Sequence, residues 1–245
     1  MKSGRLDYAL LVAGFLALWQ LLHWTVGPDV VSSPRATIAR AAELLGTRAF
    51  WGHVDATVTA FALASVISIA AGIALGLWLG LRRFAGDVAD PILGTLYSVP
   101  KITLYPIILL MFGLGISAKI AFGVIHGVFP IAIFTMNAVR NVAPVFRRTA
   151  LVMRLSSVAT AATVMAPAAL PEILAGIRVG VALTLLGTLI GELFAATSGL
   201  GFALIRAMDV HAVVDILAIT LLLFCFAASV NASVRLVERW ARHGG

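Results

Sequence analysis

The chain has 245 residues, of which 61% are hydrophobic and only 12% are charged, and its mean hydropathy is +1.03. Soluble domains carry about twice this charged fraction, so the composition excludes an ordinary soluble protein and indicates an all-α, polytopic membrane protein. The net charge of +7 would suggest nucleic-acid binding in a soluble protein. In a membrane protein it is explained by basic cytoplasmic loops, and no nucleic-acid partner is expected.

The length predicts a single transmembrane domain, residues 1–245, with no room for a nucleotide-binding domain beside the spans. Apolar runs near the roughly twenty residues that cross a bilayer predict about six membrane helices. In chain order these are Tyr8–Val26, Thr57–Leu81, Pro91–Phe112, Lys119–Ala138, Glu172–Ala195 and Ala212–Val234. The first is interpreted as a retained helix rather than a signal peptide, because Trp19 and Trp24 are typical of interfacial anchors.

Prolines divide the chain further. The third span is expected to be interrupted at Pro100 and Pro106, and the fourth to be kinked at Pro130.

Two segments outside the spans have their own predictions. Residues 197–209 are expected to form a loop. Ser33-Pro34 predicts the start of a short amphipathic helix. The apolar face of this helix is expected to contain Ile38, Ala41, Ala42 and Leu45.

Two of the spans carry glycines spaced by four residues. G-x-x-x-G spacing places the glycines on one face of a helix and allows a neighbouring helix to approach closely. The predicted packing residues are Gly72, Gly76 and Gly80 in the second span, and Gly176, Gly180, Gly187 and Gly191 in the fifth.

The distribution of lysine and arginine predicts that both termini are cytoplasmic. With the N-terminus inside, the cytoplasmic segments hold eleven of these residues and the outer segments hold five. The cytoplasmic eleven are Lys2, Arg5, Arg82, Arg83, Arg140, Arg147, Arg148, Arg154, Arg235, Arg239 and Arg242.

A basic stretch leads from this cytoplasmic side into the fifth span. Pro167 and Pro171 are expected to form an elbow, because proline lacks the N–H donor and disfavours helix in the residue before it. The pattern predicts a short helix outside the bilayer, a turn, and then a membrane helix. Glu172 would lie at the N-terminus of that helix, where the macrodipole favours an anion.

Ionisable groups within spans are costly and are therefore candidates for function. Lys101 either reaches a central pathway from a broken helix, where it would attract an anionic solute, or extends to the cytoplasmic interface. Glu192 either faces a cavity or partner and pairs with a cation, or is an interfacial carboxylate near water. His126 is interpreted as a hydrogen-bonded packing residue.

The sequence contains no phosphate-binding G-x-x-x-x-G-K-[S/T] motif and no clustered catalytic set, so an enzyme is not expected. Asp209, His211 and Asp215 could donate metal ligands. Their spacing is generic, and they are interpreted as a polar helix start rather than a metal site.

Several motifs together resemble the permease subunits of bacterial ABC importers, in the branch that handles sulfonates, taurine and nitrate. The motifs cover nearly the whole chain. The family pattern includes a cytoplasmic helix, then a proline elbow, and then a span that ends in E-x-x-x-A-x-S-G-L-G. The matching segments here are Val31-Ser-Ser-Pro34, Ser98-Val-Pro-Lys101 through Pro106, Phe112-Gly-Leu-Gly115, Ala166-Pro-Ala-Ala-Leu-Pro171, Gly176-Ile-Arg178 and Glu192–Gly201.

The resemblance implies a type I importer permease that binds no cofactor itself, with ATP and Mg²⁺ held by a separate ATPase subunit. Residues 140–171 would be the cytoplasmic coupling loop, and a helix from about Pro144 to Ala162 would dock on the ATPase. The implied coupling residues are Arg147, Arg148, Ala150, Arg154, Leu155, Ser156, Pro167 and Pro171.

One departure from the family pattern lies in this loop. Counting back from the prolines, the family's Glu-Ala-Ala falls on Arg148-Thr149-Ala150, and its glycine falls on Arg154. The departure allows the hypothesis that this chain pairs with a different permease, with asymmetric ATPase docking. A purified complex that contains only this permease would refute it.

The resemblance further implies a bacterial inner-membrane location, a second permease chain (a copy or a different one), an external solute-binding protein and surrounding lipid as partners. Lys101 and Glu192 are the candidates for the translocation path. The alternative is a carrier or channel that runs without ATP, whose expected marks are more intramembrane carboxylates or an inverted repeat.

Overall fold

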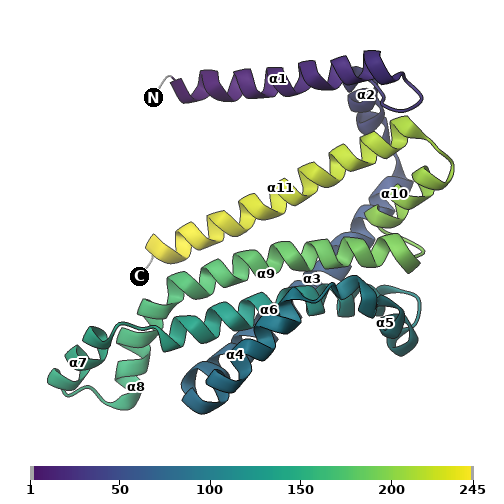
Figure 1. Ribbon diagram of the computed structural model, residues 1–245. Coiled ribbons are helices and arrows are strands. Elements are labelled where there is room, and N and C mark those ends of the chain that lie inside the picture. Colours follow the sequence, from purple (N-terminus) through teal and green to yellow (C-terminus); the bar gives the residue numbers. More distant parts are fainter. Residues whose placement is uncertain (1–2, 244–245) are drawn as a thin grey trace.

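The computed structural model describes residues 3–243, and its regular elements in that range are all helical (Figure 1). Side chains are described for residue 7 and for residues 10–240, with the exception of residues 144, 147, 151, 157, 158, 161, 162 and 195. Within this part, four helices are long and apolar enough to cross a membrane. They are α3 (Arg48–Leu81), α6 (Ile116–Arg140), α9 (Ala166–Ala195) and α11 (Val213–His243).

A bent pair of helices is a candidate fifth span, and a shorter apolar helix lies where the first span is predicted. Helix α4 (Arg83–Ser98) and the segment made of η1 (Lys101–Leu104) and α5 (Tyr105–Phe112) meet at an angle of 86°. The predicted interruption at Pro100 is confirmed. The one at Pro106 is wrong, because this proline lies in the first turn of α5, where a missing N–H costs no helical bond. Helix α1 (Ser3–Val26) includes the apolar segment Leu10–Val26.

The centre of the protein is α6, which is packed between α3 and α9. A Cβ atom added to Gly72 would lie 2.7 Å from Cβ of Ile131, and one added to Gly76 would lie 2.5 Å from Cβ of Thr135. These distances are shorter than real Cβ contacts, so the glycines are what allows the α3 backbone to lie against α6. The glycine spacing in the second predicted span therefore has a defined partner helix.

The glycines of the fifth predicted span lie in α9 and face the other side of α6. Gly176 lies against Phe134, Gly180 against Ile131, and Gly187 against the ring of His126. His126 also bonds through Nδ1 to the carbonyl of Phe122 at 2.8 Å, as expected for a packing histidine. Helix α6 is therefore held by glycine faces on both sides, and Ile131 lies between them.

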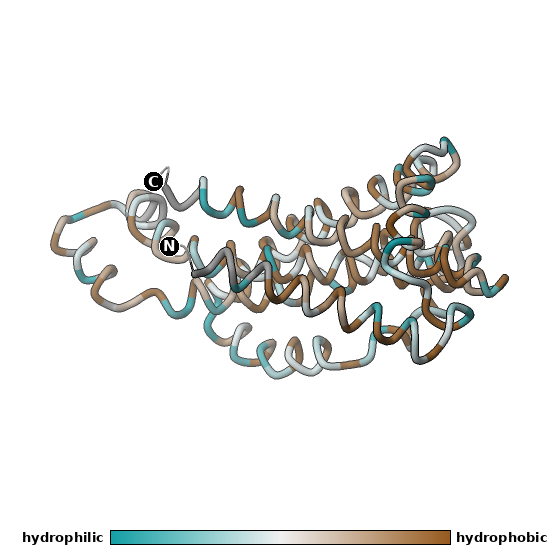
Figure 2. Tube along the Cα trace, turned by 90° about the horizontal axis from the view of Figure 1, so that it is seen from above, coloured by the Kyte–Doolittle hydropathy of each residue, from teal (hydrophilic) through white to brown (hydrophobic). Residues whose placement is uncertain are grey.

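The long helices run between two ends of the bundle (Figure 1). The start of α1, the end of α11 and the short helices α7 (Pro144–Val152) and α8 (Ser157–Thr160) lie at one end, called the α7 end below. Helices α2 (Pro34–Leu45), α5 and α10 (Leu200–Asp209) lie at the other, the α5 end. Figure 2 shows hydrophobic residues along most of the long helices and hydrophilic residues toward the C-terminal end of α11.

Two connecting segments differ from the sequence-based expectation. Residues 200–209, expected as a loop, form α10, which starts after Gly199 and buries Leu200 and Ala207. Helix α2 starts at Pro34 with Ser33 as its N-cap, as expected. Its buried residues are Thr37 and Ala41, whereas Ile38 and Leu45 of the predicted apolar face are exposed.

The buried face of α2 is set by its packing against α11. Arg40 of α2 forms an ion pair with Asp215 at the start of α11, with Nε 2.5 Å from Oδ1. The hydrogen bonds to Asp215 and Glu43 hold the pKa of Arg40 above its ordinary value, so this guanidinium stays charged. The contact gives Asp215 a structural partner.

Candidate functional site

The segment predicted to couple to an ATPase lies at the α7 end, between α6 and α9. The single helix expected over residues 144–162 is wrong, because the structure contains α7, a turn at residues 153–156, α8, and then the π-helical segment η2 (Ala161–Met165). Ser156 begins the second part by capping it, since its Oγ accepts a hydrogen bond from the N–H of Ala159 at 3.2 Å. The segment is therefore two short helices joined by a tight turn.

Arg154 is the residue that makes this turn. Its φ angle is 53°, in the left-handed region that glycine adopts without strain and other residues adopt at a cost of about 1–2 kcal/mol. The turn is closed by a hydrogen bond from the N–H of Leu155 to the carbonyl of Ala150 at 3.0 Å. Arg154 occupies the position at which the resembled family carries glycine, so the backbone shape that glycine favours is kept here with an arginine.

The proline elbow lies elsewhere than predicted. Pro167 is in the first turn of α9 and Pro171 lies inside that helix, so no turn separates the two. The helical chain instead changes direction between α8 and α9, through η2 (Figure 1). In a π-helical segment each backbone hydrogen bond joins residues five apart instead of four. This pattern is compatible with the missing N–H donor at Pro167. Glu172 follows, half-buried, within α9.

The surface of this segment is basic and apolar. The sequence from Pro144 to Met165 contains no acidic residue. Arg148 and Arg154 are exposed, as are Val152 and Met153, whose exposed fractions are 83% and 63%. Ala150 is buried and Leu155 is half-buried, while the side chain of Arg147 lies outside the described ones. Such a surface is suited to an acidic partner with an apolar contact area.

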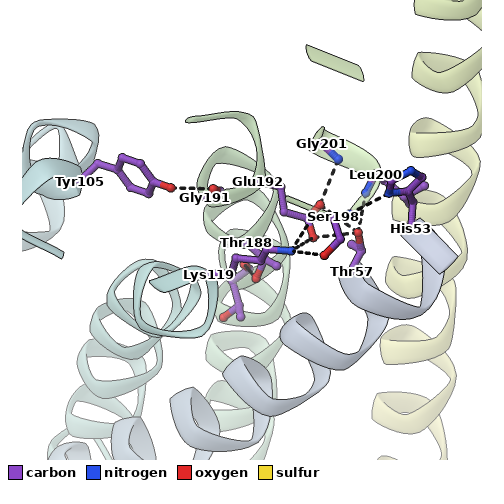
Figure 3. A network of polar contacts seen from close by, with 12 residues as sticks. His53, Thr57, Tyr105, Lys119, Thr188, Gly191, Glu192, Ser198, Leu200 and Gly201 are labelled. Carbon is purple, nitrogen blue, oxygen red and sulfur yellow. Dashed lines mark hydrogen bonds and ion pairs between the residues drawn. The ribbon is translucent and has the colours of Figure 1, made fainter. Parts of the chain in front are cut away.

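A second cluster lies at the α5 end, around Glu192 (Figure 3). The Glu192 side chain is fully buried, and its carboxylate oxygens each lie 2.9 Å from the hydroxyl of Thr57. One oxygen accepts a hydrogen bond from the N–H of Gly201 at 3.0 Å. The ammonium of Lys119 lies 3.5 Å from the other oxygen and donates to the carbonyl of Ser198 at 2.5 Å. The buried negative charge is thus paired and hydrogen-bonded.

The backbone after α9 is shaped to fit this carboxylate. Gly199 has a φ angle of 118°, and a Cβ atom there would overlap the Glu192 carboxylate. A Cβ atom on Gly201 would lie 2.7 Å from the carbonyl oxygen of Leu189 in α9. The N–H of Leu200 donates to Thr57 at 2.8 Å. The motif from Glu192 to Gly201 therefore forms a compact turn that connects α3, α6, α9 and α10.

Sequence reasoning identified Glu192 but not its partners. Pairing with a cation is observed, and the cation is Lys119, the first residue of the fourth predicted span. Its position near the start of an apolar span was the available signal. Thr57 offered none, because a threonine in an apolar helix is common and its contact depends on the packing of α3 against α9.

Lys101 lies at the bend between α4 and α5 and is buried, with an exposed fraction of 9%. Its ammonium donates to the carbonyl of Tyr97 at 2.8 Å and lies 5.8 Å from the ring centre of Phe129. Because Phe129 is near the middle of α6, Lys101 lies deep in the bundle and does not extend to the α7 end. No ion pair joins it to a carboxylate among the described residues.

The polar helix start at Asp209, His211 and Asp215 does not form a metal centre in the described part of the chain, where no group of three potential ligands comes together. His211 instead has a φ angle of 54°, in the turn that connects α10 and α11.

Comparison with known proteins assigns the class. The model of the family described as "Binding-protein-dependent transport system inner membrane component" matches residues 68–243, which is most of the chain. The chain therefore belongs to this family and is a multi-pass inner-membrane permease of a binding-protein-dependent ABC transporter. As a permease subunit it is not itself an ATPase.

Curated relatives match over most of the chain. A putative aliphatic sulfonates transport permease protein, SsuC, of Bacillus subtilis is 28% identical over 97% of this chain and 89% of its own. The taurine transport system permease protein TauC of Escherichia coli is 29% identical over 94% and 89%. The nitrate import permease protein NrtB of Synechococcus elongatus is 25% identical over 80% and 74%.

A solved structure supports the fold. A chain of the inward-facing MetNI methionine ABC transporter superposes with a TM-score of 0.60, covering 80% of this chain and 95% of its own at 19% identity. This similarity confirms the predicted all-helical permease fold.

Replacement of Arg154 tests the left-handed turn. We expect Arg154→Gly to leave the turn intact and Arg154→Val to destabilise it by about 1–2 kcal/mol, because a β-branched residue is strained at positive φ. Hydrogen–deuterium exchange of residues 145–156 measures the effect. Arg148, within α7, is the matched control. There the glycine variant should be less stable than the valine variant, because glycine costs more than valine in a helix. The same order at both positions would contradict the assignment.

The ion pair between Glu192 and Lys119 is tested by a double-mutant cycle. Glu192→Gln leaves a buried ammonium uncompensated, so the free energy of unfolding should fall by about 3–5 kcal/mol. Lys119→Met should cost a similar amount, and the double variant less than the sum of the two. Denaturant unfolding of the purified protein measures all three. The control is Glu43→Gln, in a pair with exposed fractions of 40% and 64%, where a change below about 1 kcal/mol is expected. Additive single effects would refute the pairing.

Proposed function

We propose that this permease forms, with a second permease chain, the membrane path for a small anion such as a sulfonate, taurine or nitrate. We further propose that residues 140–171 couple this path to a separate ATPase. The observation that supports the first part is the buried position of Lys101 at a broken span. The observation that supports the second is the exposed basic and apolar surface of α7 and the turn after it.

Lys101 and Lys119 are both buried, but their electrostatic surroundings differ. Lys119 is next to the Glu192 carboxylate, so its charge is balanced within the chain. Lys101 has a backbone carbonyl and two aromatic rings as its partners. A buried cation without a balancing carboxylate attracts an anion, and the broken span leaves the backbone at that depth free of a continuous helix.

The solute class is also supported by the printed functions of the relatives, which are transport of aliphatic sulfonates, taurine and nitrate. Sulfonate and nitrate carry a negative charge on oxygen atoms that accept hydrogen bonds from an ammonium group. Glu192 is a weaker candidate for the path, because its carboxylate is fully engaged in holding the α5 end together.

The remaining partners follow from this arrangement. The α7 end faces the cytoplasm and the ATPase, which binds ATP and Mg²⁺, and the two termini are on that side. The α5 end faces the external solute-binding protein. The second permease is a copy of this chain or a different one. The arginines at positions 148 and 154 require an ATPase surface with acidic residues.

The anion site is tested with the complete transporter reconstituted in vesicles, using taurine, nitrate and an alkanesulfonate as probes. Lys101→Met should lower the uptake of the transported anion about tenfold or more, because about 1.4 kcal/mol of electrostatic attraction corresponds to a factor of ten. Lys101→Arg keeps the charge and should retain most of the uptake. Equal uptake by the wild type and Lys101→Met would contradict the role of Lys101.

The coupling segment is tested by charge reversal. Arg148→Glu places a negative charge opposite acidic residues of the ATPase and should weaken the assembly at least tenfold, since like charges at an interface cost several kcal/mol. Arg148→Lys should assemble normally, and Arg206→Glu, at the α5 end, should have no effect. Co-purification and ATP hydrolysis are measured, and the mass of the complex counts the permease chains. Solute flux by this chain without ATP would instead establish the carrier alternative.

A further inference from the structure

A groove with a volume of about 430 Å³ lies between α9 and α11. Its apolar walls are formed by residues such as Val181 and Leu185 of α9 and Phe224 of α11. Ala182 and Ala228, one from each helix, make room between the walls because their side chains are small. The groove is open to the outside of the bundle, at the depth of the apolar spans.

The polar groups of this groove are gathered toward the α7 end. They are Arg178 of α9 with Asn231 and Arg235 of α11. Arg178 forms an ion pair with Glu238, with Nη1 3.4 Å from Oε2, so the charge of this arginine is compensated. Arg235 is exposed and has no ion pair among the described residues. Arg178, Arg235 and Glu238 together therefore carry one net positive charge.

We propose that this groove binds an anionic phospholipid, with an acyl chain between α9 and α11 and the phosphate at Arg235, Asn231 and Arg178. Arginine is well suited to phosphate because its guanidinium donates several hydrogen bonds in a fixed plane. Basic pockets between membrane helices bind lipid headgroups in the same way. A phosphodiester with one negative charge, as in phosphatidylglycerol, balances the one charge that Glu238 leaves uncompensated.

Charge favours a lipid over a membrane helix as the occupant. Among the described residues, α1 is an apolar helix with exposed side chains along its length, such as Leu11, Phe15 and Leu22. Its sequence from Tyr8 to Val26 contains no acidic residue, and the segment before it carries two basic residues, Lys2 and Arg5, against one carboxylate, Asp7. Such a helix from a second copy would fill the apolar part of the groove and bring no net negative charge to the arginine.

The site also has a structural consequence. Helix α9 continues at its α7 end into η2 and the coupling segment, whereas α11 makes no extensive contact with that segment among the described residues. A phospholipid between the two helices would therefore stabilise the position of α9 relative to α11 at the end where the coupling segment begins. This inference does not depend on the transported solute or on the ATPase.

The test is native mass spectrometry of the full-length chain, titrated with dioleoylphosphatidylglycerol or dioleoylphosphatidylcholine. We expect one phosphatidylglycerol per chain to bind more tightly than phosphatidylcholine. Arg235→Gln should weaken phosphatidylglycerol binding about fivefold, the factor that corresponds to about 1 kcal/mol for one arginine near a lipid surface. Arg83→Gln, an exposed arginine at the same end but outside the groove, removes the same charge and should leave binding unchanged.

The acyl-chain part is tested by filling the groove. Ala228→Trp should abolish retention of the lipid, whereas Ala232→Trp, on the same helix outside the groove lining, should not. Equal affinity for the two lipids, or equal effects of Arg235→Gln and Arg83→Gln, would overturn the proposal.

Occupation by a second copy would give a different result. The native cysteine, Cys225, is exposed beside Phe224 of the groove. A Leu18→Cys variant that forms an intermolecular disulfide with Cys225 of a second copy, with no lipid retained, would assign the groove to α1 and refute the lipid site.

Discussion

The close approach of three helix backbones is the constraint on which the rest of this structure depends. Helices α3 and α9 contact α6 through glycines, which have no side chain and so let the backbones come close. Ile131 of α6 lies between Gly72 of α3 and Gly180 of α9. In a lipid environment helices gain little from the hydrophobic effect, so such packing and polar contacts hold the bundle together. Helix α9 lies against α6 from Gly176 to Gly191, so the two helices share one packed interface along most of their length.

The two buried lysines show how one residue type serves two purposes in the same protein. Lys119 contributes to a closed network in which the carboxylate of Glu192 has donors from three other elements, so the α5 end of the bundle is fixed. Lys101 is located where Pro100 breaks a span and has no carboxylate partner among the described residues. The cost of burying an ammonium without a carboxylate is offset only in part by the carbonyl of Tyr97 and nearby rings. A site that retains such a cost is a candidate for ligand binding.

The sequence predicted features that local chemistry determines. The polytopic membrane class, the break at Pro100 and the presence of close-packing glycines follow from composition and spacing, whereas the permease family was indicated by the motifs that resemble it. It did not predict contacts that depend on packing, such as those of Glu192 with Lys119 and Thr57, which are 73 and 135 residues away. The proline elbow failed for a local reason. Proline is tolerated in the first turn of a helix, so Pro167 marks the beginning of α9 instead of a turn before it, and Pro171 lies inside the helix without ending it.

Arg154 shows that a residue can differ from the family's sequence pattern while the backbone keeps the shape that the pattern implies. The family's glycine suggests a left-handed residue, and Arg154 has the corresponding φ angle of 53°. The turn between α7 and α8 is therefore retained, and what changes is the charge that the turn presents. The same holds for Arg148, an exposed residue of α7 at the position of the family's glutamate. Under the proposed coupling, an ATPase adapted to this chain needs an altered charge pattern on its surface, but it does not need a differently shaped groove.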